Sequence, residues 1–121
     1  MANDDKNNIF DFINSYAKIY FSKEEKFFGP GIVKLLGLVN EHKNLQKASV
    51  LMEMSYTKAW KIIKRAEKNL GISLIKGQTG GIGGGSSELT KEGLELLNKY
   101  NKMHDKVDAY VKKTYHDIFV K

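Results

Sequence analysis

The chain has 121 residues, of which 41% are hydrophobic, so it can form one compact domain and is too apolar for wholesale disorder. Its net charge of +6 and pI of about 9.4 indicate a polyanionic partner only weakly, because many soluble proteins are mildly basic. The absence of cysteine excludes a disulfide framework and a thiolate metal site. Neither a signal peptide nor a membrane-spanning run is visible, so we expect a cytoplasmic protein without membrane partners.

The first part of the chain predicts an extension followed by a hairpin. Residues 1–17 form the predicted extension, in which 9–16 (IFDFINSY) fits a short helix or a strand equally well. Residues 18–21 and 26–28 flank a polar turn, which predicts a β-hairpin. Pro30 lies in a Gly-Pro-Gly breaker and can also open a helix.

Three helices are predicted next. Apolar residues at helical spacing indicate a helix over 32–42, and Asn44 is a suitable N-cap for a short helix over 45–51. Ser55 is a suitable N-cap for a third helix, which Gly71 would end.

The third helix concentrates the positive charge of the chain. Residues 55–78 carry six cations and one anion, whereas residues 1–17 carry a net charge of −2. On a helical wheel the cations lie opposite an apolar arc that we expect to face the core. Trp60, at the edge of that arc, is expected to pack rather than to stack on bases. A basic stripe of this kind is often no more than a solvated face.

A glycine-rich segment follows this helix. A strand over 72–76, a loop over 77–87 and a short return strand over 87–89 are predicted, and Thr90 would cap the last helix. Glycines let the backbone lie close to a sugar-phosphate chain, although a functionless linker is the alternative. The segment lacks the Lys-Ser/Thr of a P-loop.

The last helix carries a heptad-like apolar seam. We interpret it as a dimerisation helix, and the alternative is that it folds back over the core of its own chain. The predicted dimerisation residues are Leu96, Tyr100, Met103, Val107 and Tyr110.

A cationic helix followed by a glycine hairpin is the arrangement with which a winged helix-turn-helix grips duplex DNA. Residues near the start of the third helix would read base edges, and later cations and the glycine segment would contact phosphates. The predicted DNA-binding residues are Ser55, Tyr56, Thr57, Lys58, Lys61, Lys64, Arg65, Lys68, Lys76, Gln78, Thr79, Gly80, Gly81, Gly83 and Gly84. For Ser55 the alternative is that it only caps the helix and does not contact DNA.

Catalytic and metal chemistry have little support in the sequence. No Ser/His/Asp set or carboxylate pair lies in an apolar context. His104 and Asp108 lie one turn apart, but two ligands do not make a metal site, and a surface ion pair is the expected reading. We therefore expect no enzyme activity, no metal and no cofactor.

Four segments resemble the N-terminal DNA-binding domain of ModE-type molybdate-responsive regulators, which is related to the LysR-type winged helix. They are FFGPGIVKLL (27–36), MSYTKAWKIIKRAEKNLG (54–71), the glycines of 79–85 and LTKEG (89–93). The resemblance spans roughly residues 17–100. It implies a homodimeric winged helix whose third helix, over 55–68, enters the major groove, with 76–87 as the wing.

The chain also departs from that pattern. Glu53 stands in a turn where such domains often have glycine, and a non-glycine residue at positive φ costs about 1 kcal/mol. Lys43-Asn44 replaces the usual Gly-Ser, and Ile82 occupies a wing position that is commonly basic. The molybdate-sensing domains would follow the last helix but lie outside these 121 residues. Molybdate binding is therefore not carried over, and any effector stays open.

The sequence as a whole predicts a mainly α fold with a small β component, a winged helix-turn-helix with a long C-terminal dimerisation helix. The predicted divisions are an extension (1–17), a DNA-binding domain (18–89) and the dimerisation helix (90–121). The predicted function is that of a homodimeric, sequence-specific regulator of transcription that binds duplex DNA. The alternative is a protein-interaction scaffold that uses the same fold and the seam of the last helix.

Overall fold

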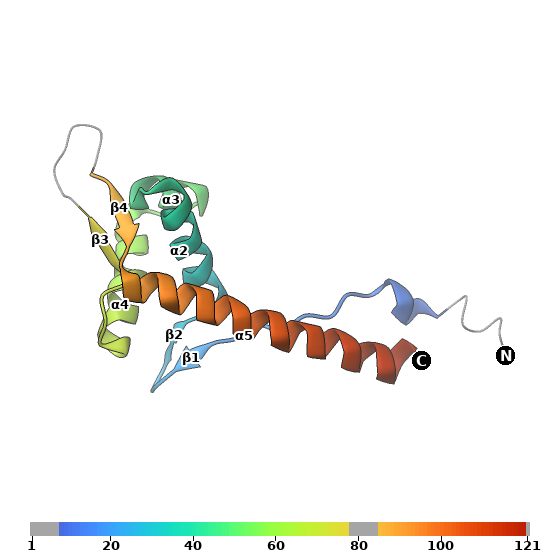
Figure 1. Ribbon diagram of the computed structural model, residues 1–121. Coiled ribbons are helices and arrows are strands. Elements are labelled where there is room, and N and C mark those ends of the chain that lie inside the picture. Colours follow the sequence, from blue (N-terminus) through green and yellow to red (C-terminus); the bar gives the residue numbers. More distant parts are fainter. Residues whose placement is uncertain (1–7, 78–84, 121) are drawn as a thin grey trace. The chain divides into compact units, whose positions relative to one another are not determined.

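The computed structural model describes residues 8–77 and 85–120 and is mainly helical, with two short β-hairpins (Figure 1). The chain divides into two compact units. We call residues 19–100 the core unit, and the described residues of the two chain ends, 8–18 and 101–120, the terminal unit. Among the described residues, no helix combines the length and the apolar character needed to cross a membrane.

The first hairpin leads directly into a helix. Strand β1 (Phe21–Ser22) pairs antiparallel with β2 (Lys26–Phe28), so the predicted hairpin is confirmed with a shorter first strand. Helix α2 (Pro30–His42) begins at Pro30, where the missing N–H and the fixed φ of proline suit a first turn.

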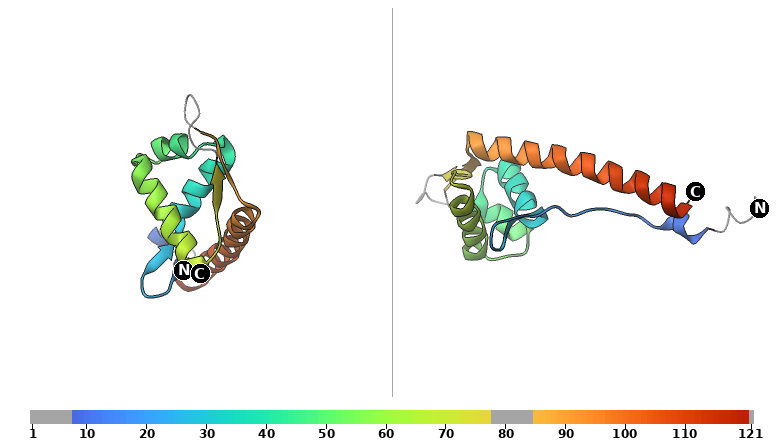
Figure 2. Two further views of the ribbon diagram at one scale, coloured as in Figure 1. Left: turned by 90° about the vertical axis from the view of Figure 1, so that its left-hand side faces the viewer. Right: turned by 90° about the horizontal axis from the view of Figure 1, so that it is seen from below.

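Helices α3 (Leu45–Leu51) and α4 (Tyr56–Leu70) begin at the predicted caps. The Asn44 side chain accepts a hydrogen bond from the Lys47 N–H at 2.8 Å, and the Ser55 hydroxyl accepts one from the Lys58 N–H at 3.1 Å. Gly71 ends α4 in the left-handed region. Figure 2 (left) shows α4 descending from the end of α3 along one side of the core unit.

The turn between α3 and α4 has the strained residue that the resemblance to ModE-type domains implies. Glu53 has a φ of 56°, and Lys43, at the end of α2, has a φ of 55°. Both are non-glycine residues in the left-handed region, which costs about 1 kcal/mol each. The tight turns at both ends of α3 are therefore held by the packing of the helices rather than by the local preference of these residues.

The second hairpin is formed by β3 (Ile75–Gly77) and β4 (Ser87–Leu89), in the antiparallel register Ile75 to Leu89. The predicted strand over 72–76 begins three residues later than expected. Before it pairs with β4, the chain is bound to α4: the Leu74 N–H donates to the carboxylate of Glu67 at 2.7 Å. The Ser87 N–H donates to the Lys43 carbonyl at 3.0 Å, which attaches β4 to the end of α2.

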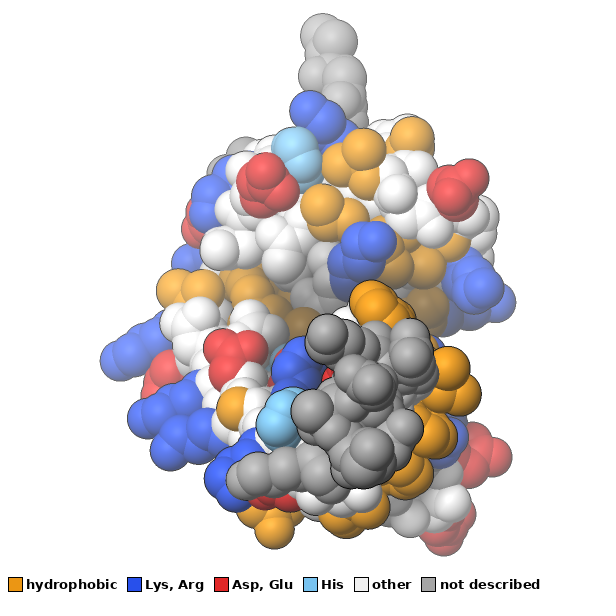
Figure 3. All heavy atoms as spheres, turned by 90° about the vertical axis from the view of Figure 1, so that its right-hand side faces the viewer, with side chains coloured by type: hydrophobic (Ala, Val, Ile, Leu, Met, Phe, Trp, Pro, Cys, Tyr) orange, Lys and Arg blue, Asp and Glu red, His pale blue; other side chains and the backbone are white. Residues whose placement is uncertain are grey.

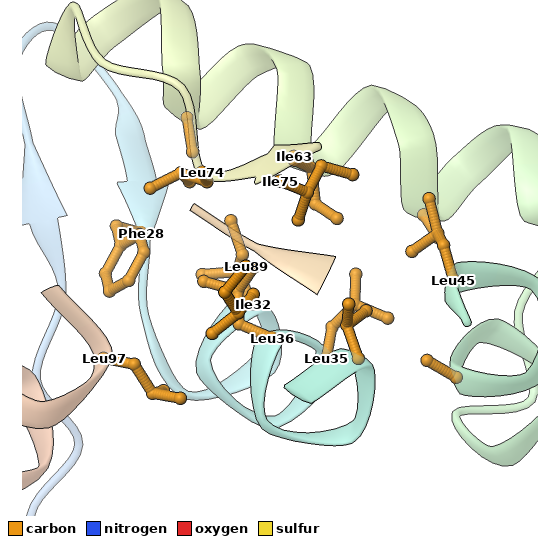
Figure 4. Close-up of a cluster of buried hydrophobic side chains, with 14 of the residues drawn as sticks. Phe28, Ile32, Leu35, Leu36, Leu45, Ile63, Leu74, Ile75, Leu89 and Leu97 are labelled. Carbon is orange, nitrogen blue, oxygen red and sulfur yellow. The ribbon is translucent and has the colours of Figure 1, made fainter. Parts of the chain in front are cut away.

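One hydrophobic core joins these elements (Figure 4). Each helix of the core unit contributes side chains, and the hairpins add the residues that close the core at its edges. The largest fully buried apolar side chains are Leu35, Leu36, Val39, Leu45, Ile63 and Leu74, with Phe28 almost completely buried. A Cβ on Gly93 would clash with the Leu74 carbonyl oxygen, so glycine is needed where the first turn of the helix after the second hairpin passes the residue before β3.

Helix α5 (Lys91–Tyr115) begins after Thr90, whose hydroxyl accepts a hydrogen bond from the Gly93 N–H at 2.9 Å, as predicted. Its residues up to 100 belong to the core unit and the rest to the terminal unit. A π-helical turn, η2 (His116–Val120), continues it.

In the terminal unit, the start of the chain lies beside the end of α5 (Figures 1 and 2). The ambiguous segment 9–16 is neither a full helix nor a paired strand: η1 (Ile9–Phe12) is a single 3₁₀ turn and the residues after it are extended. The Tyr115 hydroxyl donates to the Phe10 carbonyl at 2.7 Å, and the Lys112 ammonium donates to the Ser15 carbonyl at 2.6 Å. Phe10 also packs on Phe119.

Candidate nucleic-acid interface

The outer face of α4 is cationic and exposed. Ala59, Ile63 and Ala66 are fully buried on the inner side, so the helical-wheel prediction of one apolar and one cationic face is confirmed. Lys58, Lys61 and Lys68 are exposed, and none of them forms an ion pair with another described residue. These ammonium groups are therefore available to an external anion.

The start of α4 presents short polar and aromatic side chains beside these cations. Tyr56 and Thr57 are exposed, which suits contact with a ligand. Ser55 is also exposed, but its hydroxyl is engaged in capping the helix. Capping the start of α4 is therefore an established structural role of Ser55.

Lys64 is engaged within the chain. Its Nζ lies 3.0 Å from a carboxylate oxygen of Glu67 and 4.2 Å from the centroid of the Trp60 ring. Trp60 is 41% exposed and is not part of the core cluster, so it lies at the surface of α4 rather than in the core. At the edge of the apolar arc, one helical turn from Lys64, its ring contacts the ammonium group instead.

Glu67 connects α4 to the strand that follows it. Its carboxylate accepts hydrogen bonds from the Leu74 N–H at 2.7 Å and from the Ile75 N–H at 3.3 Å. Burial raises the pKa of Glu67, but the hydrogen bonds from Leu74, Lys64 and Ile75 together outweigh it, so the pKa lies below its ordinary value. The one anion of the basic segment is thus a structural anchor.

Arg65 is paired as well. Its guanidinium donates to the carboxylate of Glu25, in the turn between β1 and β2. This turn and the second half of α4 border an open hollow of about 460 Å³. The residues that line the hollow are Lys23, Glu24, Glu25, Arg65, Lys68 and Asn69.

The β3–β4 hairpin carries less free positive charge than the sequence indicates. Lys76 lies opposite Glu88 in the register, and their charged groups are 3.4 Å apart. A Cβ on Gly77 would lie 2.7 Å from the Ser86 carbonyl oxygen, so the strands approach closely where the loop begins. The remaining predicted residues of this segment lie outside the described residues; they are Gln78, Thr79, Gly80, Gly81, Gly83 and Gly84.

The predicted dimerisation residues divide into two groups. Tyr100 is 3% exposed, and its hydroxyl donates to the Ile19 carbonyl at 2.8 Å, so it belongs to the core of its own chain. Leu96 is partly buried against the same core, as the alternative reading of the seam expects. Met103 and Tyr110 are exposed and Val107 is partly exposed, so these three remain open to a partner.

The expected surface pair of His104 with Asp108 is not formed. His104 lies 3.8 Å from Asp105, and Asp108 lies 3.0 Å from the Lys112 ammonium, which offers a full charge one turn away. Within residues 8–77 and 85–120, no three potential metal ligands come together.

Sequence reasoning missed the two acidic partners of the cationic helix. The spacing of Lys64 and Glu67 is a recognisable helical ion-pair signal, although the contact of Glu67 with β3 is not. Glu25 and Arg65 are separated by 40 positions, so only the tertiary structure brings them together.

A scan of this chain against protein-family models finds no match, and a search of curated proteins finds none either.

Proposed function

We propose that this chain is a sequence-specific duplex-DNA-binding protein that regulates transcription, with a winged helix-turn-helix fold. The observation that carries the proposal is the row of exposed cations Lys58, Lys61 and Lys68 on the outer face of α4, which form no ion pair with another described residue. Helix α4 follows α3 after a tight turn and precedes a β-hairpin, which is the element order of a winged helix. The resemblance to ModE-type DNA-binding domains implies the same order.

In this proposal α4 lies in the major groove. Tyr56, Thr57, Lys58 and Lys61, near its start, contact base edges, because the first turns of a recognition helix reach deepest into the groove. Lys68, about two turns after Lys61, contacts a phosphate and adds affinity without sequence information. The β3–β4 hairpin lies along the backbone beside the groove.

The proposal includes a homodimer. A regulator with twofold symmetry reads a pseudo-palindromic site whose half-sites are about 34 Å apart or a multiple of that distance. Met103 and Tyr110 on α5 are exposed and available for such an interface.

The test is fluorescence anisotropy of a labelled duplex from the DNA upstream of the protein's own coding sequence, against a scrambled duplex. We expect tighter binding to the upstream duplex and a loss of more than about tenfold in affinity between 50 and 200 mM salt, because cations that contact phosphates release counterions. Replacing Lys58, Lys61 and Lys68 together by alanine should weaken binding by more than about tenfold.

The matched control removes the same charge from Lys99, Lys102 and Lys106, which are exposed on α5. The affinity of this control variant should stay within about threefold of the wild type, because none of the three lysines belongs to α4 or to the β3–β4 hairpin and exposed charges are screened by salt. Equal, salt-dependent binding to both duplexes would support DNA binding but show that the specific site lies outside the upstream duplex. No binding by the wild type at low salt would overturn the proposal and favour the protein-interaction scaffold.

A further inference from the structure

Arg65 differs from Lys58, Lys61 and Lys68 because an acidic side chain from another part of the fold is bound to it. Its guanidinium is held by the Glu25 carboxylate, which comes from the β1–β2 turn and not from α4. The side chains are 50% and 78% exposed, so water and salt screen the pair. An anion that competes with Glu25 for Arg65 therefore loses little free energy by breaking this ion pair.

The surroundings of the pair are suited to such an anion. Lys68 lines the same hollow as Arg65 and Glu25 and forms no ion pair with a described residue. A carboxylate and a DNA phosphate both offer two oxygens to the fork of a guanidinium, so they occupy the same position on arginine. Glu25 thus stands where a phosphate bound jointly by Arg65 and Lys68 would lie.

The ion pair is not what holds the hairpin in place. Phe28 of β2 is 2% exposed, and its ring packs against the rings of Phe21 and Tyr100 with centroids 5.4 and 5.6 Å away. This buried aromatic packing fixes the hairpin in the core unit. The charge of Glu25 can therefore be removed without loosening the turn that carries it.

We propose that Glu25 is an intramolecular substitute for a DNA phosphate: it occupies Arg65 and withholds one cationic contact from duplex DNA. The inference rests on the proposed function and adds to it a built-in limit on affinity. Phosphate contacts supply nearly all of non-specific binding, so the limit acts on DNA of any sequence. Glu25 acts through Arg65 and is a positioning residue of the interface.

The experiment measures the affinity of the full chain for a random-sequence duplex over a range of salt concentrations. We expect Glu25→Gln to bind about two- to fivefold tighter. Its plot of log affinity against log salt should be steeper by about 0.9, the slope of one additional phosphate contact. Glu24→Gln is the matched control, because Glu24 lies in the same turn but has no ion-pair partner among the described residues; it should change affinity less than about twofold.

A second pair of variants isolates the role of Arg65. Arg65→Ala should remove the whole gain of Glu25→Gln, because that gain depends on the freed guanidinium. A purely structural role of Glu25 would not produce this dependence. Thermal unfolding followed by circular dichroism should give the same midpoint for all variants, since the pair is exposed.

Two results overturn the inference while DNA binding stands. One is an equal gain from Glu24→Gln and Glu25→Gln, and the other is a gain that persists in the Glu25→Gln, Arg65→Ala double variant. If the wild-type chain binds no duplex at low salt, the proposed function fails and this inference fails with it.

Discussion

At the scale of single residues, Glu67 shows how one carboxylate orders the segment after α4. It accepts two backbone hydrogen bonds from Leu74 and Ile75 and pairs with Lys64. The contacts with the backbone direct the chain from the end of α4 into β3. Lys64, which the sequence assigns to phosphate contact, is therefore bound to this anchor and is less available to a ligand than Lys68.

We predict that Glu67→Gln destabilises the protein by about 1–2 kcal/mol at neutral pH, because the charge-assisted hydrogen bonds to the backbone are lost. Urea unfolding measures this change. Glu95→Gln, an exposed carboxylate on α5, is the control and should change stability by less than about 0.5 kcal/mol.

The same variant tests the direction of the pKa shift. The pKa of folded Glu67 lies below its ordinary value of 4.5, so its stabilisation is complete above that pH and is lost as the pH falls through the folded pKa. The difference in unfolding free energy between the wild type and Glu67→Gln should therefore shrink below about pH 4.5. A difference that stays constant down to pH 3 contradicts the shift.

At the scale of elements, α4 combines two tasks on one helix. Its buried side fixes it against α2, α3 and β2, and its outer side carries the free cations. Because the buried alanines at 59 and 66 are small, the helix lies close to the core, and the long lysines extend away from it. In the proposed division, the residues near the start of this helix contact base edges and Lys68, near its end, contacts a phosphate.

That division makes a prediction for two substitutions. Lys68→Ala should weaken binding to all duplexes by a similar factor and reduce the salt slope by about 0.9, as expected for one phosphate contact. Thr57→Ala should change the ranking of duplexes and leave the salt slope unchanged, because a hydroxyl contact to a base releases no counterion. Selection from a random duplex library, followed by salt titrations, measures both, and the same behaviour in the two variants contradicts the division.

At the scale of the whole molecule, the terminal unit has an apolar surface without a core of its own. None of its described residues is fully buried, whereas eight large apolar side chains are exposed. They are Ile9, Phe12, Ile13, Tyr16, Met103, Tyr110, Ile118 and Phe119. Figure 3 shows hydrophobic side chains gathered along one flank of this unit.

The size of this surface suits the proposed dimer. At roughly 100 Å² of exposed area per side chain, the eight residues offer roughly 800 Å², which is what each partner contributes to a standard interface. Phe12 is 82% exposed and Tyr110 is 71% exposed, so both are available to a second copy of the chain. The start of the chain thus joins α5 in the proposed interface.

We predict that Phe12→Ser and Tyr110→Ser together shift the protein from dimer to monomer, since an interface loses two of its largest apolar side chains. Sedimentation velocity at micromolar concentration measures the change. Val50→Ser is the control, because Val50 is 67% exposed on α3 in the core unit and should leave the dimer intact. A monomeric wild type would contradict the proposed dimer.

The sequence by itself determined the presence of α2 to α5 and the helix ends that carry a cap or a left-handed glycine. Asn44, Ser55, Gly71 and Thr90 act within three or four residues of themselves, through caps and positive φ, so their roles are readable in the chain. The two faces of α4 were equally predictable, because burial follows the helical period. The left-handed φ of Glu53 was expected from a resemblance and is confirmed.

Only the tertiary structure decided which charges and apolar groups are free. Arg65 is occupied because the fold brings Glu25 beside it, and Tyr100 is buried because the first hairpin covers it, whereas Met103 and Tyr110 of the same seam are exposed. A periodic pattern tells which residues share a helix face, but not what covers that face. That depends on contacts between segments far apart in the chain, which residue spacing does not encode.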